Sequence, residues 1–140
     1  MKTIGQPPFY SSFFLATVII ALFLGISSFV TYQQTPWKAP ASADAKKNPL
    51  ASDAATIAAG KEVYVKECQS CHGKKGKGDG PSAATLDIPA GNFSTAATQG
   101  QSDGALFWKI EEGRKPMPSF KKKLTENQAW QTVVFIRTLK

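Results

Sequence analysis

The feature that most constrains this chain is the pentapeptide Cys68-Gln69-Ser70-Cys71-His72. It holds both cysteines and the single histidine of all 140 residues. Every thiol and the sole imidazole therefore lie within five positions, and two cysteines are too few for a disulfide scaffold. A loop of glycine and lysine follows, ending at Pro81.

Several kinds of site use two cysteines at this spacing. A zinc site needs four ligands, usually as two separated pairs, and the chain has no second pair. A thioredoxin-like redox pair belongs to an α/β pattern, whereas strand signals are absent here. A plain disulfide would leave His72 unexplained. The spacing instead favours covalent haem attachment, with thioethers from Cys68 and Cys71 to the two vinyl groups and His72 as the proximal iron ligand.

A low-spin haem in an electron carrier needs a second axial ligand, and methionine commonly partners histidine. No second histidine exists and Met1 is the initiator, which leaves Met117. Pro116 and Pro118 bracket Met117, and we expect them to make a stiff, extended segment that holds the thioether at a constant distance from iron. A gap-filling core residue is the other interpretation of Met117. A lysine ligand or an open iron position are the alternatives to its ligation.

The N-terminal part of the chain is apolar. No charged residue occurs from Thr3 to Trp37, and Phe13–Val30 is an almost continuous apolar run of 18 residues. Because about 20 helical residues cross a bilayer core, residues 1–32 are predicted to form a single transmembrane anchor. The aromatic residues expected at the membrane interfaces are Phe9, Tyr10, Tyr32 and Trp37.

An uncleaved or cleaved signal peptide is the alternative to an anchor. Its apolar region is usually about 7–15 residues long, and the candidate cleavage sequence Ala41-Ser42-Ala43 lies far downstream of the run. Residues 33–53 are rich in Pro, Ala, Ser, Lys and Asn, which predicts a flexible linker that contributes little to a core.

Residues 54–140 are predicted to form an all-α domain with long loops. Ser52 or Asp53 can cap a first helix, and Thr125 and Gln128 have capping-box spacing at the start of a last one. A short helix is expected from near Asp103 to Gly113.

Gly60 lies in the middle of the first predicted helix, where glycine costs about 1 kcal/mol relative to alanine. It is either tolerated without a role or the place where the last helix, with its bulky Trp130 and Phe135, crosses closely. Long loops in so small a domain indicate that they wrap something, such as a cofactor.

The domain resembles a class I monohaem cytochrome c over nearly all of residues 54–140. The segments that carry the resemblance are GKEVYVKECQSCHG, GRKPMPSF and WQTVVFIRTL. It implies one covalent haem c, with Gly60 and Tyr64 packed against residues 133–136. It also implies that a proline carbonyl accepts a hydrogen bond from His72 and so orients the ring, and Pro81 in GDGP matches that proline.

The resemblance implies single-electron transfer by a membrane-tethered carrier in a respiratory or photosynthetic chain. Iron bound by both His72 and Met117 is saturated, so we expect a carrier and not an enzyme. A haem subunit built into a larger membrane oxidoreductase complex is an alternative, as is a peroxidase or ligand sensor with a labile Met117. Family biogenesis implies a haem domain on the periplasmic side of the cytoplasmic membrane, although the lysines that flank the anchor favour the opposite orientation.

The charge of the chain narrows the class of partner. It has 17 Lys and Arg against 10 Asp and Glu, a net charge of +7. This excess suits acidic redox partner proteins or an anionic membrane surface, and no recognition motif supports nucleic-acid binding. Two lysine clusters, Lys74, Lys75, Lys77 and Lys121, Lys122, Lys123, follow the haem motif and the methionine segment. They either dock acidic partners or only solubilise the loops.

Overall fold

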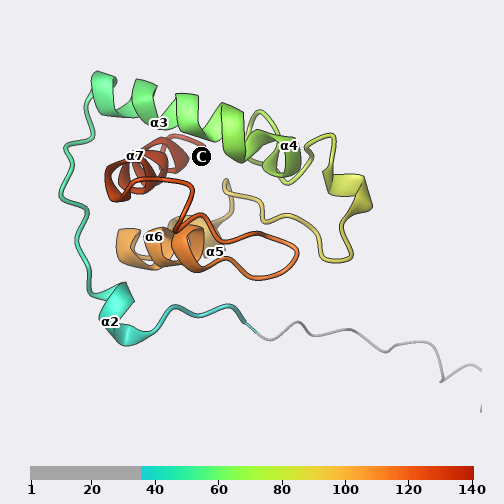
Figure 1. Cartoon of the computed structure of the whole chain (residues 1–140), viewed down its shortest axis with the longest axis horizontal. Coiled ribbons are helices and arrows are strands. Elements are labelled where there is room, and N and C mark those ends of the chain that lie inside the picture. Colours follow the sequence, from blue (N-terminus) through green and yellow to red (C-terminus); the bar gives the residue numbers. More distant parts are fainter. Residues whose placement is uncertain (1–35) are drawn as a thin grey trace, which may run out of the picture. The chain divides into compact units, whose positions relative to one another are not determined.

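Two helices that cross at Gly60 form the frame of the domain. They are α3 (Ala54–Glu67) and α7 (Glu126–Ile136), drawn in green and red in the computed structural model, which describes residues 36–140 (Figure 1). A Cβ atom on Gly60 would lie 2.0 Å from the carbonyl oxygen of Gln131. Since carbon and oxygen cannot approach so closely, only glycine permits this crossing. The predicted tight crossing is confirmed, and the rings of Tyr64 and Phe135 lie 5.1 Å apart beside it.

Both long helices begin at the predicted caps. The Asp53 carboxylate accepts a hydrogen bond from the Thr56 backbone N–H at 2.7 Å. Thr125 Oγ1 accepts from the Gln128 N–H at 3.2 Å, while Gln128 Oε1 accepts from the Thr125 N–H at 2.9 Å. These bonds satisfy backbone donors that would have no partner within the helix.

A third helix, α6 (Asp103–Glu112), packs against α7 and completes the core. It ends at Gly113, as predicted, where a φ of 66° suits glycine. The rings of Phe107 and Trp130 stack with their centroids 4.0 Å apart. The buried core cluster consists of Leu106, Phe107, Ile110, Phe120, Ala129, Trp130, Val133 and Ile136.

Four short helical elements complete the order: α2 (Ala41–Asp44), α4 (Gln69–His72), the 3₁₀ helix η1 (Ala83–Thr85) and α5 (Ala96–Gln99). Across residues 36–140 the only β-type pairing is an isolated bridge between Arg114 and Met117. The prediction of an all-α domain with long loops is thus confirmed for these residues. The predicted anchor at residues 1–32 lies outside the described residues, and no helix within 36–140 has the length and apolarity to span a bilayer.

Parts of the predicted linker contact the domain, although most of its described residues are exposed. Ala43 on α2 is buried, and a Cβ on Gly104 of α6 would lie 2.1 Å from the Ala43 carbonyl oxygen. Ser102 Oγ donates to the Asp44 carboxylate at 2.6 Å. The segment therefore belongs to the same unit, which begins at Trp37.

Two larger apolar residues account for this packing. Leu50 packs against the core cluster, and Trp37 lies beside Trp108 of α6 with ring centroids 6.3 Å apart. Trp37 is thus half-buried against the domain, whereas the sequence suggested a membrane-interface aromatic. Apolar residues that are widely spaced in a Pro-, Ala- and Lys-rich segment give no periodic signal. The contacts of Leu50 and Trp37 with the domain could therefore not be predicted from the sequence.

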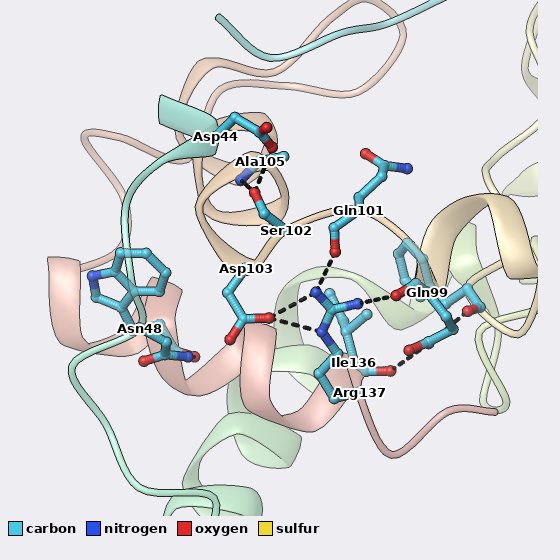
Figure 2. A network of polar contacts seen from close by, with 11 residues as sticks. Asp44, Asn48, Gln99, Gln101, Ser102, Asp103, Ala105, Ile136 and Arg137 are labelled. Atoms are coloured by element: carbon cyan, nitrogen blue, oxygen red, sulfur yellow. Dashed lines mark hydrogen bonds and ion pairs between the residues drawn. The ribbon is translucent and has the colours of Figure 1, made fainter. Parts of the chain in front are cut away.

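Arg137, just after α7, ties the connection between α5 and α6 to the end of the chain (Figure 2). Its guanidinium donates to the Asp103 carboxylate at 2.8 Å and to the carbonyl oxygens of Gln99 and Gln101 at 2.8 and 2.6 Å. The Gln99 side chain donates in turn to the Ile136 carbonyl at 3.2 Å. These bonds hold the start of α6 in register with α7.

Candidate functional site

Cys68, Cys71 and His72 come together at the junction of α3 and α4. Cys68 ends α3, where its N–H donates to the Tyr64 carbonyl at 2.9 Å, and it also precedes α4. The N–H groups of Cys71 and His72 both donate to the Cys68 carbonyl, at 3.2 and 2.9 Å. One helical turn therefore carries all three side chains. Both cysteines are half-buried and have free thiols in this structure.

The imidazole of His72 is oriented by the loop before α5. Its Nδ1 lies 3.1 Å from the Gly91 carbonyl oxygen. Because a carbonyl only accepts, Nδ1 carries the proton and Nε2 keeps a free lone pair. The Phe93 ring stacks on the imidazole at 4.4 Å with an interplanar angle of 21°. Burial lowers the pKa of His72, which favours the neutral form that binds metals.

The prediction that Pro81 accepts this hydrogen bond is wrong, because Gly91 accepts it instead. The segment around Pro81 is bonded to the backbone of α4: Gly80 N–H donates to the Cys71 carbonyl at 3.2 Å, and Ser82 N–H to the Ser70 carbonyl at 2.8 Å. Pro81 itself is exposed.

Gly91 and Phe93 are functional candidates that the sequence reasoning missed. The one signal available was an aromatic residue in an otherwise small and polar loop, since Phe93 is the sole aromatic between His72 and α6. Phe93 is half-buried and packs against the core cluster. Its N–H donates to the Gly76 carbonyl at 2.7 Å, and the Gln99 side chain donates to its carbonyl at 2.7 Å.

The glycines after His72 allow that loop to fold closely onto Phe93 and Tyr64. Gly76 has a φ of 68°, and a Cβ there would lie 3.0 Å from Phe93 Cδ2. Tyr64 is buried and donates its hydroxyl proton to the Gly73 carbonyl at 2.7 Å. Burial raises the pKa of Tyr64, so this donor keeps its proton at all physiological pH values.

Met117 lies in the loop between α6 and α7. Its N–H donates to the Arg114 carbonyl at 2.9 Å, which closes a tight four-residue turn. The extended segment expected from the two prolines is therefore wrong at Pro116, which lies inside this turn, whereas Pro118 follows it. Met117 is half-buried and packs against the same core cluster as Phe93. Packing of this kind fits a core residue and a ligand equally well.

The two lysine clusters differ in their surroundings, although all six side chains are exposed. Lys121 pairs with Glu112 at 3.1 Å, and Lys123 pairs with Glu67. Within residues 36–140, none of Lys74, Lys75 and Lys77 forms an ion pair. The first cluster therefore presents more uncompensated positive charge than the second.

The donor set fits a covalently bound haem. Two free thiols two residues apart precede an imidazole whose Nε2 is unprotonated and whose ring is oriented by a carbonyl. Across the described residues, no three Cys, His, Asp or Glu side chains gather into a site for a bare metal ion.

Comparison with known proteins supports the same kind of site. The family model described as "Cytochrome C oxidase, cbb3-type, subunit III" matches residues 55–136, more than half of the chain. One similar structure is the Kuenenia stuttgartiensis reducing HAO-like protein complex Kustc0457/Kustc0458, with 34% identity and a TM-score of 0.60. That match covers 65% of this chain and 46% of the other, so this chain spans about half of that protein's length.

A second similar structure is the KustC0563 c-type cytochrome, with 30% identity and a TM-score of 0.51. Here the match covers 58% of this chain and 96% of the other. No curated protein matches the chain.

Proposed function

Because the chain belongs to the family of the cbb3-type cytochrome c oxidase subunit III domain and is a class I monohaem cytochrome c, we propose that it passes single electrons through one haem c held by Cys68, Cys71, His72 and Met117. The cytochrome c domain supports the role of an electron carrier. One observation carries the proposal: a single helical turn presents two free thiols and an imidazole oriented by Gly91.

Cys68 and Cys71 would hold the porphyrin through two thioethers. Such a thioether forms when one S–H adds across a vinyl double bond, with sulfur and hydrogen going to neighbouring carbons, and it needs no oxidant. Burial raises the pKa of the Cys68 thiol to about 12, with further contributions from Glu67 and Cys71. Without the cofactor this thiol is therefore protonated at neutral pH, which opposes its oxidation to a disulfide.

His72 Nε2 and the Met117 sulfur would hold the iron. The hydrogen bond from His72 Nδ1–H to the Gly91 carbonyl keeps the ring oriented and raises its basicity. When bound, the haem supplies a reversible one-electron iron couple, and a methionine ligand raises its potential relative to a second imidazole. Phe93 and Met117 both pack against one core cluster, which limits the movement of these two side chains.

The N-terminal apolar run and the surface charge support a location and a class of partner. We propose that residues 1–32 form a single-pass anchor in the cytoplasmic membrane, with the domain on the periplasmic side. The apolar run of residues 13–30 supports the anchor. The exposed cluster of Lys74, Lys75 and Lys77 adjoins the proposed haem attachment site in sequence and suits an acidic redox partner.

A haem subunit built into a membrane complex is the second candidate. It is favoured by the oxidase-subunit description of the matching family and by the similar chain that belongs to a multi-protein complex. Extraction in mild detergent separates the two candidates. A stable multi-subunit particle would support the built-in subunit, and a haem protein that leaves the membrane alone would support the tethered shuttle.

The absorption spectrum of the purified ferric protein tests the axial ligands. We expect the weak far-red band of His/Met-ligated ferric haem in the wild type and its loss in Met117→Ala, with covalent haem retained in both. As a control, Val65→Ala changes an exposed residue of α3 and should leave the band intact. A band that persists in Met117→Ala would show that another group binds the iron.

A further inference from the structure

The methionine loop (residues 113–119) is held firmly at its base. Phe120 N–H donates to the Ile110 carbonyl at 3.1 Å, and Lys121 N–H donates to the Glu111 carbonyl at 3.2 Å. The Ser119 hydroxyl donates to the same Glu111 carbonyl. These bonds join the two ends of the loop to the last turn of α6. The turn from Arg114 to Met117 projects beyond this base, so other contacts must set its position.

One such contact comes from the segment before α2. The Arg114 guanidinium carbon lies 4.9 Å from the centroid of the Trp37 ring, within the range of a cation–π interaction. The carbonyl of the same arginine accepts the Met117 N–H at 2.9 Å. Trp37 is therefore joined to the backbone of Met117 through a single residue.

Trp37 is itself held by α6. Its ring lies beside that of Trp108, and the Lys109 ammonium lies 5.4 Å from its centroid. Burial lowers the pKa of Lys109, and the charge of Arg114 lowers it further. The two cations thus repel each other, and the electron-rich ring offsets that repulsion. Removing the ring would take away this compensation together with one of the contacts of Arg114, and so loosen its turn.

We propose that Trp37 is a positioning residue for Met117, acting through Arg114. The segment that links the N-terminal region to the domain then sets how firmly the methionine is presented to the iron. This inference rests on the proposed function in one respect, the ligation of iron by Met117. The position of the loop itself can be measured whether or not that ligation exists.

Binding of imidazole to the full-length ferric holoprotein measures how readily Met117 leaves the iron. We expect Trp37→Ala to bind imidazole about fivefold more tightly than the wild type, the factor for loss of one cation–π contact. Trp37→Phe keeps a ring and should recover most of the wild-type affinity. Thr125→Ala removes the capping box of α7, away from the loop, and controls for a general loss of stability.

A double-mutant cycle identifies Arg114 as the intermediary. Arg114→Gln removes the cation and should raise imidazole affinity by a similar factor. The double variant should add little to either single change, because both remove the same contact. Fully additive effects, or an affinity in Trp37→Ala no higher than in Thr125→Ala, would overturn the proposal.

Hydrogen exchange of the Met117 amide in the same proteins separates this inference from the proposed ligation. We expect exchange about fivefold faster in Trp37→Ala and unchanged in Thr125→Ala. If the wild type lacks the far-red band and binds imidazole as tightly as every variant, Met117 is not the ligand. The exchange rates then still decide the role of Trp37, since equal rates in the wild type and Trp37→Ala would overturn it.

Discussion

The imidazole Nδ1 of His72 lies 3.1 Å from the carbonyl oxygen of Gly91, 19 residues further along the chain. The ring of Phe93, two residues beyond that carbonyl, stacks on the same imidazole. One loop thus both sets the tautomer of His72 and covers its face. The position of His72, the proposed iron ligand, therefore depends on the position of the segment from Gly91 to Phe93.

Phe93→Ala removes the covering ring. We expect a loss of about 2 kcal/mol in unfolding free energy, below the range for a fully buried phenylalanine because Phe93 is half-buried. The reduction potential should also shift as water reaches His72. Denaturant unfolding and potentiometry of the holoprotein measure both. Phe93→Leu keeps most of the volume and serves as control, and unfolding curves of Phe93→Ala that overlay the wild type would contradict this role.

Gly60→Ala tests the helix crossing. The added Cβ would lie 2.0 Å from the Gln131 carbonyl, so α3 and α7 must separate. The cost, about 2 kcal/mol or more, should exceed the gain in helix propensity of about 1 kcal/mol. Gly91→Ala is the matched control, because a Cβ there meets nothing within 4 Å and the carbonyl is kept. Thermal unfolding that ranks the two variants in the reverse order would refute the crossing.

The cap at Asp53 predicts a pH dependence. Hydrogen bonds from Thr56 lower the pKa of Asp53, so its folded value lies below the unfolded value of about 3.9. The stabilisation is present above that unfolded value and is lost as pH falls through the lower folded pKa. Asp53→Asn keeps an acceptor but does not titrate. The stability advantage of the wild type over Asp53→Asn should therefore shrink on acidification below about pH 4. An advantage that stays constant from neutral to acidic pH would rule out this linkage.

The difference between the lysine clusters predicts unequal effects on docking. Replacing Lys74, Lys75 and Lys77 with glutamine should slow reduction by an acidic redox protein about tenfold at low ionic strength. The same change at Lys121, Lys122 and Lys123 should have less effect, because Glu112 and Glu67 already compensate two of these charges. Stopped-flow rates across a salt series measure both. Equal rates for the two variants at low salt would mean that the first cluster only solubilises its loop.

Local sequence signals predicted the parts of the fold that depend on neighbouring residues. The caps at Asp53 and Thr125 and the helix end at Gly113 follow from the chemistry of a few adjacent positions. The close approach of α3 and α7 at Gly60 could be predicted because a glycine in one helix and bulky residues in the other complement each other. Cys68, Cys71 and His72 could be selected as candidates because no other thiol or imidazole competes with them, and the structure brings them together on one helical turn.

Long-range contacts were harder to predict. Nothing local distinguishes Gly91 from Pro81 as the partner of His72, since the choice depends on how the intervening loop folds back. Trp37 lies in a segment whose composition indicates a linker. Its ring nevertheless contacts Trp108 of α6 and Arg114 of the methionine loop, both far away in the sequence. The turn at Met117 is closed by the hydrogen bond from its N–H to the Arg114 carbonyl. The two flanking prolines do not predict this bond.

The most direct test of the central claim is the intact mass of the denatured full-length protein. We expect the wild type to carry the mass of one haem after denaturation and acid extraction, because thioethers at Cys68 and Cys71 survive both. The Cys68→Ser/Cys71→Ser double variant should lose that mass entirely, whereas Val65→Ala, a change at an exposed residue of the same helix, should keep it. A wild-type protein whose mass equals that of the bare chain would contradict the account.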